Sequence, residues 1–221
     1  MPQGPAKVFP MTMTLHNALE IVGGFSQPSK MPCQGFSIPA WLCKTGGKLR
    51  GIKGSVCSKC YALKGRYSFS NVKNAMQRRF DGLKNERWIE AMTVAIGGTE
   101  GSGYFRFFDS GDLQSLEMLE NIAQVARNLP DITFWLPTRE YLIVADYVKK
   151  NGAFPSNLTV RLSAYMIEGK APIAFAQKYG AVASGVSKAG FSCPSSSQGG
   201  KCLSCRSCWR QDVPVVTYKQ H

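Results

Sequence analysis

The sequence lacks the features that place a chain in a membrane or direct it out of the cell. No run approaches the roughly 18 uncharged apolar residues that a membrane helix needs, so we expect no membrane partner. The first ten residues carry Lys7 but no apolar core followed by a cleavage site, so we expect no export. The predicted location is therefore the cytoplasm, where thiols stay reduced.

Common catalytic signatures are missing as well. His16 and His221 are the only histidines, which argues against a His-rich metal site or a Ser-His-Asp triad. There is no P-loop, dinucleotide-binding fingerprint or metalloprotease helix. Acidic residues are scarce, with 14 Asp and Glu against 27 Lys and Arg and a formal net charge of +13. This basic excess permits a polyanionic partner such as nucleic acid but does not demonstrate one.

Cysteine, in contrast, is abundant for a chain with reduced thiols. There are eight cysteines, and structural disulfides are rare in that compartment, so metal or cluster ligation is the economical explanation. We expect all eight to be ligands, in two groups with the spacings Cys33-x9-Cys43-x13-Cys57-x2-Cys60 and Cys193-x8-Cys202-x2-Cys205-x2-Cys208.

The spacing within each group indicates the kind of site. Two intervening residues let both thiolates of a turn point at one metal or one cubane. The Cys-x2-Cys-x2-Cys run of the second group is similar to the ligand run of bacterial ferredoxins, with Cys193 as the remote fourth ligand. The cofactor expected is one or two [4Fe-4S] clusters, and zinc stays open as the alternative at either group.

The organisation of the chain predicts an α/β fold with a partial (β/α) barrel-like parallel sheet. Residues 1–66 read as an irregular Cys-rich segment, residues 67–190 as the α/β core and residues 191–221 as a second Cys-rich segment, all within one compact domain. Alternating patterns predict strands at 104–108, 132–136, 158–163 and 181–184, and helices at 15–22, 71–80, 86–96, 113–128, 140–150 and 172–179. Repeated strand and helix units favour a parallel sheet.

Polar side chains follow three of these strands. Ligand sites in parallel sheets lie at the carboxyl ends of the strands. The candidates are Asp109 and Asp112 after the first strand, Thr138, Arg139 and Glu140 after the second, and Arg161, Ser163 and Tyr165 in and after the third. We take Asp109, Asp112, Arg139 and Arg161 as candidate catalytic residues of a pocket. The alternative for the two aspartates is that they cap the helix expected from Leu113.

Several stretches resemble the phage-encoded gene product 88 family. They are CQGFSIPA (33–40), CSKCYALKGRY (57–67), FDSGDLQS (108–115), FWLPTREY (134–141) and GGKCLSCRSCW (199–209). The resemblance covers nearly the whole chain after about Met31. It implies a phage protein in the cytoplasm of an infected bacterial host, and it implies no particular reaction.

A more distant resemblance is to radical S-adenosylmethionine enzymes, in which three cysteines hold a [4Fe-4S] cluster and leave one iron open for the methionyl amine and carboxylate. Cys43, Cys57 and Cys60 would be the three, and residues 109–112 would stand where those enzymes place an amine-binding loop. The first spacing of thirteen residues is longer than in that superfamily. Cys33 could also complete the cluster as a fourth ligand and close the open iron.

The function expected is therefore that of an iron–sulfur protein. Radical or redox chemistry on a small molecule, with S-adenosylmethionine as a further cofactor, stays open as its activity. The rival is a nucleic-acid- or protein-binding module in which the cysteines hold structural zinc or iron–sulfur. The basic and aromatic stretch at 59–80 fits either a nucleic-acid surface or a solvated helix face.

Overall fold

The protein is described by a computed structural model that covers residues 13–190 and 192–220. Within this part, six strands form one sheet: β1 (Gly35–Phe36), β2 (Tyr104–Phe107), β3 (Thr133–Thr138), β4 (Leu158–Ser163), β5 (Val182–Ser187) and β6 (Val215–Lys219). The α-helices are α1 (Leu15–Val22), α2 (Lys44–Arg50), α3 (Ser70–Gly82), α4 (Trp88–Thr99), α5 (Leu116–Asn128), α6 (Tyr141–Asn151) and α7 (Ile173–Lys178).

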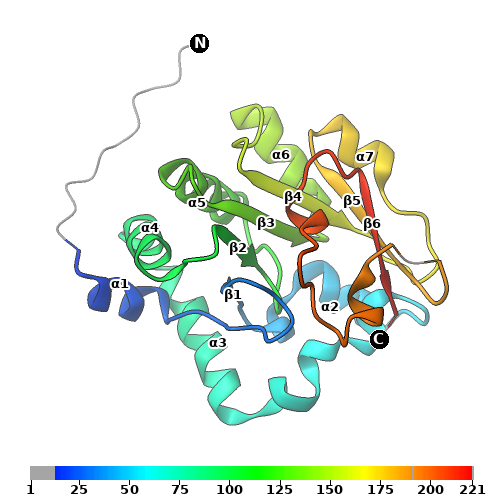
Figure 1. The fold of residues 1–221 in the computed structure, drawn as a ribbon, viewed down its shortest axis with the longest axis horizontal. Coiled ribbons are helices and arrows are strands. Elements are labelled where there is room, and N and C mark those ends of the chain that lie inside the picture. The colour runs from blue at the N-terminus through cyan, green and yellow to red at the C-terminus, as the bar shows by residue number, and fades with distance from the viewer. Residues whose placement is uncertain (1–12, 191, 221) are drawn as a thin grey trace.

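The sheet is parallel throughout, and its strands follow one another in chain order from β1 to β6. Parallel neighbours need crossover connections, and α5, α6 and α7 provide them between β2, β3, β4 and β5. These helices lie in an arc along one face of the sheet (Figure 1). The edge strands β1 and β6 do not pair, so the sheet stays open. This arrangement confirms the expected α/β fold with a partial barrel.

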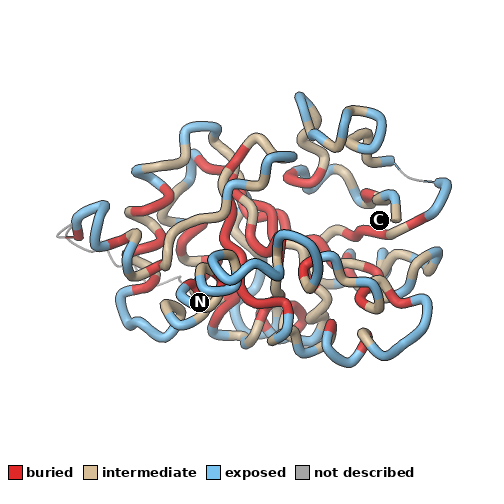
Figure 2. Tube along the Cα trace, turned by 90° about the horizontal axis from the view of Figure 1, so that it is seen from below, coloured by how far each residue is buried: buried red, intermediate tan, exposed pale blue. Residues whose placement is uncertain are grey.

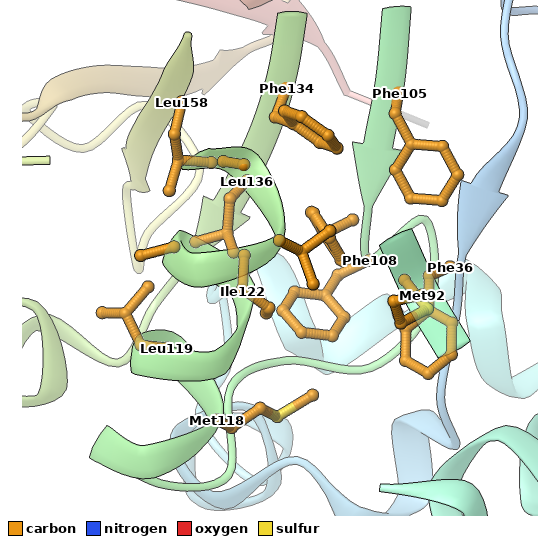
Figure 3. Packing of buried hydrophobic residues seen from close by; sticks show 14 of the residues in the cluster. Phe36, Met92, Phe105, Phe108, Met118, Leu119, Ile122, Phe134, Leu136 and Leu158 are labelled. Carbon is orange, nitrogen blue, oxygen red and sulfur yellow. The ribbon is translucent and has the colours of Figure 1, made fainter. Parts of the chain in front are cut away.

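The two faces of the sheet carry different side chains because neighbouring residues of a strand point to opposite sides. Phe105, Phe134 and Leu158 point to the face covered by the helices, where they pack in the main hydrophobic core (Figure 3). Arg106 and Trp135 belong to the opposite face. The buried residues accordingly concentrate along the strands in the middle of the molecule (Figure 2).

The opposite face is covered by the chain between β5 and β6. Trp209 in this connection packs edge-on against Trp135, with ring centroids 5.1 Å apart, and its indole Nε1 donates to the Phe105 carbonyl at 3.0 Å. Thr159 Oγ1 donates to the Trp209 carbonyl at 2.7 Å. The second Cys-rich segment is therefore packed onto the sheet on the side away from α5 and α6, as Figure 1 also shows.

Several element boundaries expected from the sequence are wrong by one to three residues, and two of them have a clear physical reason. The helix expected from Leu113 begins at Leu116, because Ser115 caps it by accepting from the Met118 N–H at 3.1 Å. The strand expected to stop at Pro137 continues to Thr138. The Phe134 N–H donates toward β4, so the position of Pro137 faces β2, whose pairing with β3 ends at Trp135. The proline therefore lies where no ladder donor is needed.

Three elements lie in segments that were expected to be irregular: β1, α2 and β6. Strand β1 has only two residues, one of them glycine, and α2 contains Gly46 and Gly47, so neither has a periodic pattern to detect. Strand β6 has the sequence Val-Val-Thr-Tyr-Lys, and its β-branched and aromatic residues are typical of a strand. The sequence prediction missed it because the whole segment was assigned to the Cys-rich region. Both Cys-rich segments thus contribute a strand to the same sheet.

Candidate functional site

The carboxyl ends of the parallel strands meet at one edge of the sheet, and the polar residues singled out by the sequence gather there. Asp109 and Asp112 follow β2, Arg139 and Glu140 follow β3, and Tyr165 follows β4. The structure connects them directly: the Arg139 N–H donates to Asp112 Oδ2 at 3.0 Å, and the Tyr165 hydroxyl donates to the Arg139 carbonyl at 3.1 Å.

Residues 40–63, which we call the cysteine loop, lie across this edge and are tied to three strand ends. The Tyr61 hydroxyl donates to the Asp109 carbonyl at 2.6 Å, next to β2. Thr45 donates from both N and Oγ1 to the Glu140 carboxylate at 2.8 Å, next to β3. The loop is also tied to the end of β4, where the Val56 N–H donates to the Tyr165 carbonyl at 2.9 Å.

Three cysteines of the loop, Cys43, Cys57 and Cys60, lie near enough for Cys60 to raise the thiol pKa of the other two, and we call them the three-cysteine site. Cys43 lies at the start of α2, and the other two lie in and beside a short 3-10 turn. A Cβ atom built on Gly46 would be 3.5 Å from the Cys57 sulfur and 3.8 Å from the Cys43 sulfur. Both sulfurs therefore border the same small space, which the glycine keeps open.

The thiols of Cys43 and Cys57 are protonated when no metal holds them. Burial, together with nearby Asp112, Cys60 and Cys57, raises the pKa of Cys43 to about 12, against the lowering effect of Arg139. Burial likewise raises the pKa of Cys57, against the lowering effect of Arg139. Clustered thiols of this kind favour a cation that replaces their protons.

Asp112 is the carboxylate that borders the three-cysteine site. It is 4% exposed and accepts hydrogen bonds from Thr138 Oγ1 at 2.6 Å, the Leu113 N–H at 2.8 Å and the Arg139 N–H. Burial still raises the pKa of Asp112 to about 6, despite these three donors. The alternative role of capping a helix from Leu113 does not apply, because α5 begins after Ser115.

Asp109 is directed to a different set of partners. Its carboxylate accepts from the Tyr67 hydroxyl at 2.8 Å, from Ser26 Oγ at 3.0 Å and from the Ser37 hydroxyl. The sequence alone did not indicate that these three hydroxyls surround Asp109, since they lie 42 to 83 residues away from it. Asp109 thus fastens the entry of the cysteine loop rather than facing the thiols.

The backbone between the two aspartates is tightly constrained. Phe108 has φ of 56°, a conformation that costs a non-glycine residue free energy and persists where surrounding structure enforces it. Gly111 has φ of 87°, and a Cβ there would lie 2.3 Å from Ile38 Cγ1. Only glycine fits at 111, so the turn that carries Asp112 to the site depends on it.

Arg161 has a different setting from the other three candidate pocket residues. It is fully buried, and its guanidinium makes five hydrogen bonds to four backbone carbonyls, those of Ala183, Ser207, Arg210 and Val213. Three of these carbonyls belong to the connection between β5 and β6. These contacts account for its burial and fasten that connection to the sheet.

The structure places Cys33 with the C-terminal cysteines and not with the group in which the sequence listed it. Cys33 packs in a small hydrophobic cluster with Cys208, Trp135, Trp209 and Val216, on the face opposite the helices. Burial, Glu100 and Cys202 raise the pKa of the Cys33 thiol to about 12, against the lowering effects of Arg106 and Arg206, so Cys33 lies near Cys202 of the C-terminal segment. The Cys202 N–H also donates to the Lys30 carbonyl at 2.9 Å, which fixes the two segments side by side.

We call the resulting group the five-cysteine site; its members are Cys33, Cys193, Cys202, Cys205 and Cys208. All eight cysteines of the chain are free thiols. Over residues 13–190 and 192–220, no group of three or more His, Cys, Asp or Glu side chains is spaced to hold a single metal ion. A zinc ion needs every ligand sulfur about 2.3 Å from one point, whereas in a cubane each thiolate binds a different iron.

Comparison with known proteins gives one match. A family model described as gene product 88 matches residues 12–211. No curated protein and no solved structure matches the chain. None of the helices in the described ranges is long and apolar enough to cross a membrane.

Proposed function

This chain belongs to the gene product 88 family, and from that premise and the geometry of its cysteines we propose that it is an iron–sulfur protein. Cys43, Cys57 and Cys60 hold a [4Fe-4S] cluster at the carboxyl edge of the sheet. The observation that carries the proposal is the separation of these three thiols from Cys33, because three protein ligands leave one iron of a cubane open.

The surroundings of the open iron favour a ligand that carries both an amine and a carboxylate. Asp112 supplies a buried carboxylate beside Cys43, and Arg139 supplies a guanidinium close enough to lower the pKa of Cys57. A carboxylate pairs with an ammonium group and a guanidinium with a carboxylate. S-adenosylmethionine carries both groups on its methionyl part, so it is the proposed co-substrate.

The chain's own residues bind and orient the co-substrate and exclude water from the site. Asp112 is held in place by Thr138 and two backbone N–H groups, so its orientation does not depend on the ligand. Glu140 and Tyr61 fix the cysteine loop over the strand ends. The bound cluster supplies one-electron reducing power to whatever the open iron holds.

Anaerobic isolation tests this proposal. We expect a brown protein with broad absorbance at about 400 nm and with iron and sulfide in equal amounts. Cys57→Ala removes binding of S-adenosylmethionine and its reductive cleavage, whereas the control Lys59→Ala, an exposed residue of the same turn, retains both. A colourless protein with stoichiometric zinc contradicts the proposal.

A second candidate function, nucleic-acid binding, is favoured by the distribution of charge. Residues 44–87 contain 12 Lys and Arg against two Asp and Glu, so this fifth of the chain carries a net +10 of the total +13. Ten of these cations are exposed, and Phe69 among them is 58% exposed. A pocket of about 310 Å³ beside the cysteine loop is lined by Trp41 and Lys73. Aromatic and basic groups together suit single-stranded nucleic acid.

Fluorescence anisotropy with a labelled single-stranded oligonucleotide tests the second candidate. Lys64→Glu/Arg66→Glu weakens binding at low salt by about tenfold or more, and the salt slope decreases because fewer counterions are released. The control Lys170→Glu/Lys178→Glu makes the same change of charge on exposed residues near α7. Equal losses in both variants, or no binding by the wild type, argue against a nucleic-acid surface.

A further inference from the structure

The five-cysteine site draws on two segments that are distant in the sequence. Cys33 precedes β1, and the other four cysteines lie between β5 and β6. The backbone hydrogen bond from Cys202 to Lys30 joins the two segments, and a Cβ on Gly200 would lie 3.3 Å from the Lys30 side chain. The proximity of Cys33 to the C-terminal thiols is therefore a property of the backbone and not of one side-chain rotamer.

We propose that the five-cysteine site binds a second [4Fe-4S] cluster on the sheet face opposite the helices, and that Cys33 is one of its four ligands. This site goes beyond the proposed function, which concerns only Cys43, Cys57 and Cys60. Four of the five thiolates complete the coordination of a cubane, so this second cluster has no open iron.

The polarity around these sulfurs fits a cluster. Three hydroxyl groups lie within hydrogen-bond reach of three of the sulfurs: Tyr218 is 3.2 Å from Cys208, Ser195 is 3.2 Å from Cys193 and Ser207 is 3.5 Å from Cys205. Hydrogen bonds to cluster sulfurs stabilise the reduced state. A cluster ligated by four thiolates carries net negative charge, which such donors offset.

Two arginines and one carboxylate lie beside the same sulfurs. Arg106 and Arg206 are near both Cys33 and Cys202, and Glu100 is near Cys33. Arg106 is stacked on Trp135 with its Cζ 4.3 Å from the ring centroid, and Arg206 lies over Tyr104 at 5.0 Å. Both guanidinium groups are thus held in place by aromatic rings beside the thiols, where they balance the charge of a cluster.

Hydrophobic side chains shield part of the five-cysteine site from solvent. Cys33 is 7% exposed and Cys208 is 9% exposed, and both pack with Trp135, Trp209 and Val216. Apolar side chains of similar volume would fill the same space, so packing alone does not require five thiols here. Binding of a cofactor explains why these sulfurs lie together.

The experiment removes the first site so that the second can be measured alone. Anaerobically reconstituted Cys43→Ala/Cys57→Ala/Cys60→Ala protein is expected to retain about four iron atoms per chain, with the reduced-state electron paramagnetic resonance signal of a [4Fe-4S] cluster. Adding Cys33→Ala to this variant is expected to lower the iron content severalfold or, where the fifth thiol takes the place of Cys33, to change the g values of that signal. The control Val216→Ala removes buried volume from the same hydrophobic cluster without removing a sulfur, and it is expected to keep both.

Several outcomes overturn the inference. Iron content and signal that survive Cys33→Ala unchanged exclude Cys33 as a ligand. A loss of iron in Val216→Ala as large as in Cys33→Ala shows that packing, not ligation, explains the effect. A triple variant that binds zinc or no metal excludes the second cluster. If the three-cysteine site binds no cluster, these measurements still test the five-cysteine site, because the triple variant lacks the three-cysteine site. Circular dichroism checks that each variant is folded.

Discussion

Single residues control the space around the three-cysteine site. Gly46 and Gly47 are adjacent in α2, where each lowers helix stability relative to alanine. They differ in surroundings: a Cβ at 46 would lie 3.1 Å from the Cys43 Cβ and close to two sulfurs, while a Cβ at 47 would meet nothing within 4 Å. Gly46 is therefore required by the site, whereas Gly47 is not.

Gly46→Ala is expected to reduce the iron bound at the three-cysteine site by half or more, because the new methyl group enters the space that both sulfurs border. Gly47→Ala is the matched control and is expected to raise the free energy of unfolding by about 0.5–1 kcal/mol without loss of iron. Iron analysis and urea denaturation measure the two effects. Equal iron in both variants contradicts the proposed position of the cluster.

Arg106 acts on the five-cysteine site through its charge. Its guanidinium lies near Cys33 and Cys208 on one side and near Tyr61 and Asp109 on the other. Removing a positive charge disfavours the more negative, reduced cluster. Arg106→Gln is therefore expected to lower the reduction potential by on the order of 50–100 mV. Arg106→Lys keeps the positive charge, so its reduction potential is expected to stay near the wild-type value. A redox titration followed by absorbance in the triple variant measures the potential, and an unchanged value for Arg106→Gln contradicts the assignment.

At the scale of elements, the chain between β5 and β6 replaces the helix found in the other crossovers. The connection has 3-10 turns but no α-helix in the ranges described, so its backbone carbonyls need partners from outside. Arg161 of β4 donates to three of these carbonyls in four hydrogen bonds. This explains why an arginine occupies an interior position of the sheet.

Arg161→Met is expected to lower the free energy of unfolding by about 3 kcal/mol, because several buried carbonyls lose their donor. Arg210→Met removes an exposed arginine from the same segment and is expected to leave stability near the wild-type value. Urea denaturation of the metal-free proteins, monitored by tryptophan fluorescence, compares them. Similar stability of the two variants shows that the carbonyl contacts do not hold the connection.

The sequence predicts those elements whose residues repeat with a clear period. The range Leu158–Ser163 is matched at both ends, and α1 begins and ends as expected. Sequence-based prediction fails where tertiary contacts determine the ends of an element. Pro137 is tolerated inside β3 because β2 pairs with β3 only as far as Trp135, and no local pattern reveals the length of β2. The site follows the same rule. The polar residues at the strand ends were predictable, but the position of Cys33 depends on which segments the fold brings together.

At the scale of the molecule, the two groups of cysteines join different parts of the chain. The three-cysteine site joins two turns of the cysteine loop, which Tyr61 and Thr45 tie to the strand ends, and the five-cysteine site joins residue 33 to residues 193–208. A cofactor that binds only the folded arrangement stabilises the whole fold by mass action.

Removal of iron by a chelator under reducing conditions is therefore expected to lower the melting temperature by on the order of 10 °C. Differential scanning calorimetry of the loaded and metal-free protein measures the change. The triple variant that lacks the three-cysteine site is expected to show a smaller shift, because it has only one cluster to lose. A melting temperature that is independent of iron contradicts a structural role for either cluster.

The central claim is that Cys43, Cys57 and Cys60 hold a [4Fe-4S] cluster with one open iron. Mössbauer spectroscopy of the ⁵⁷Fe-loaded wild-type protein, recorded with and without S-adenosylmethionine, tests it most directly. The account predicts that one iron of a [4Fe-4S] cluster changes its isomer shift when the ligand is added, while the other irons do not. Spectra that are identical with and without the ligand, or a protein that takes up zinc in place of iron, contradict the account.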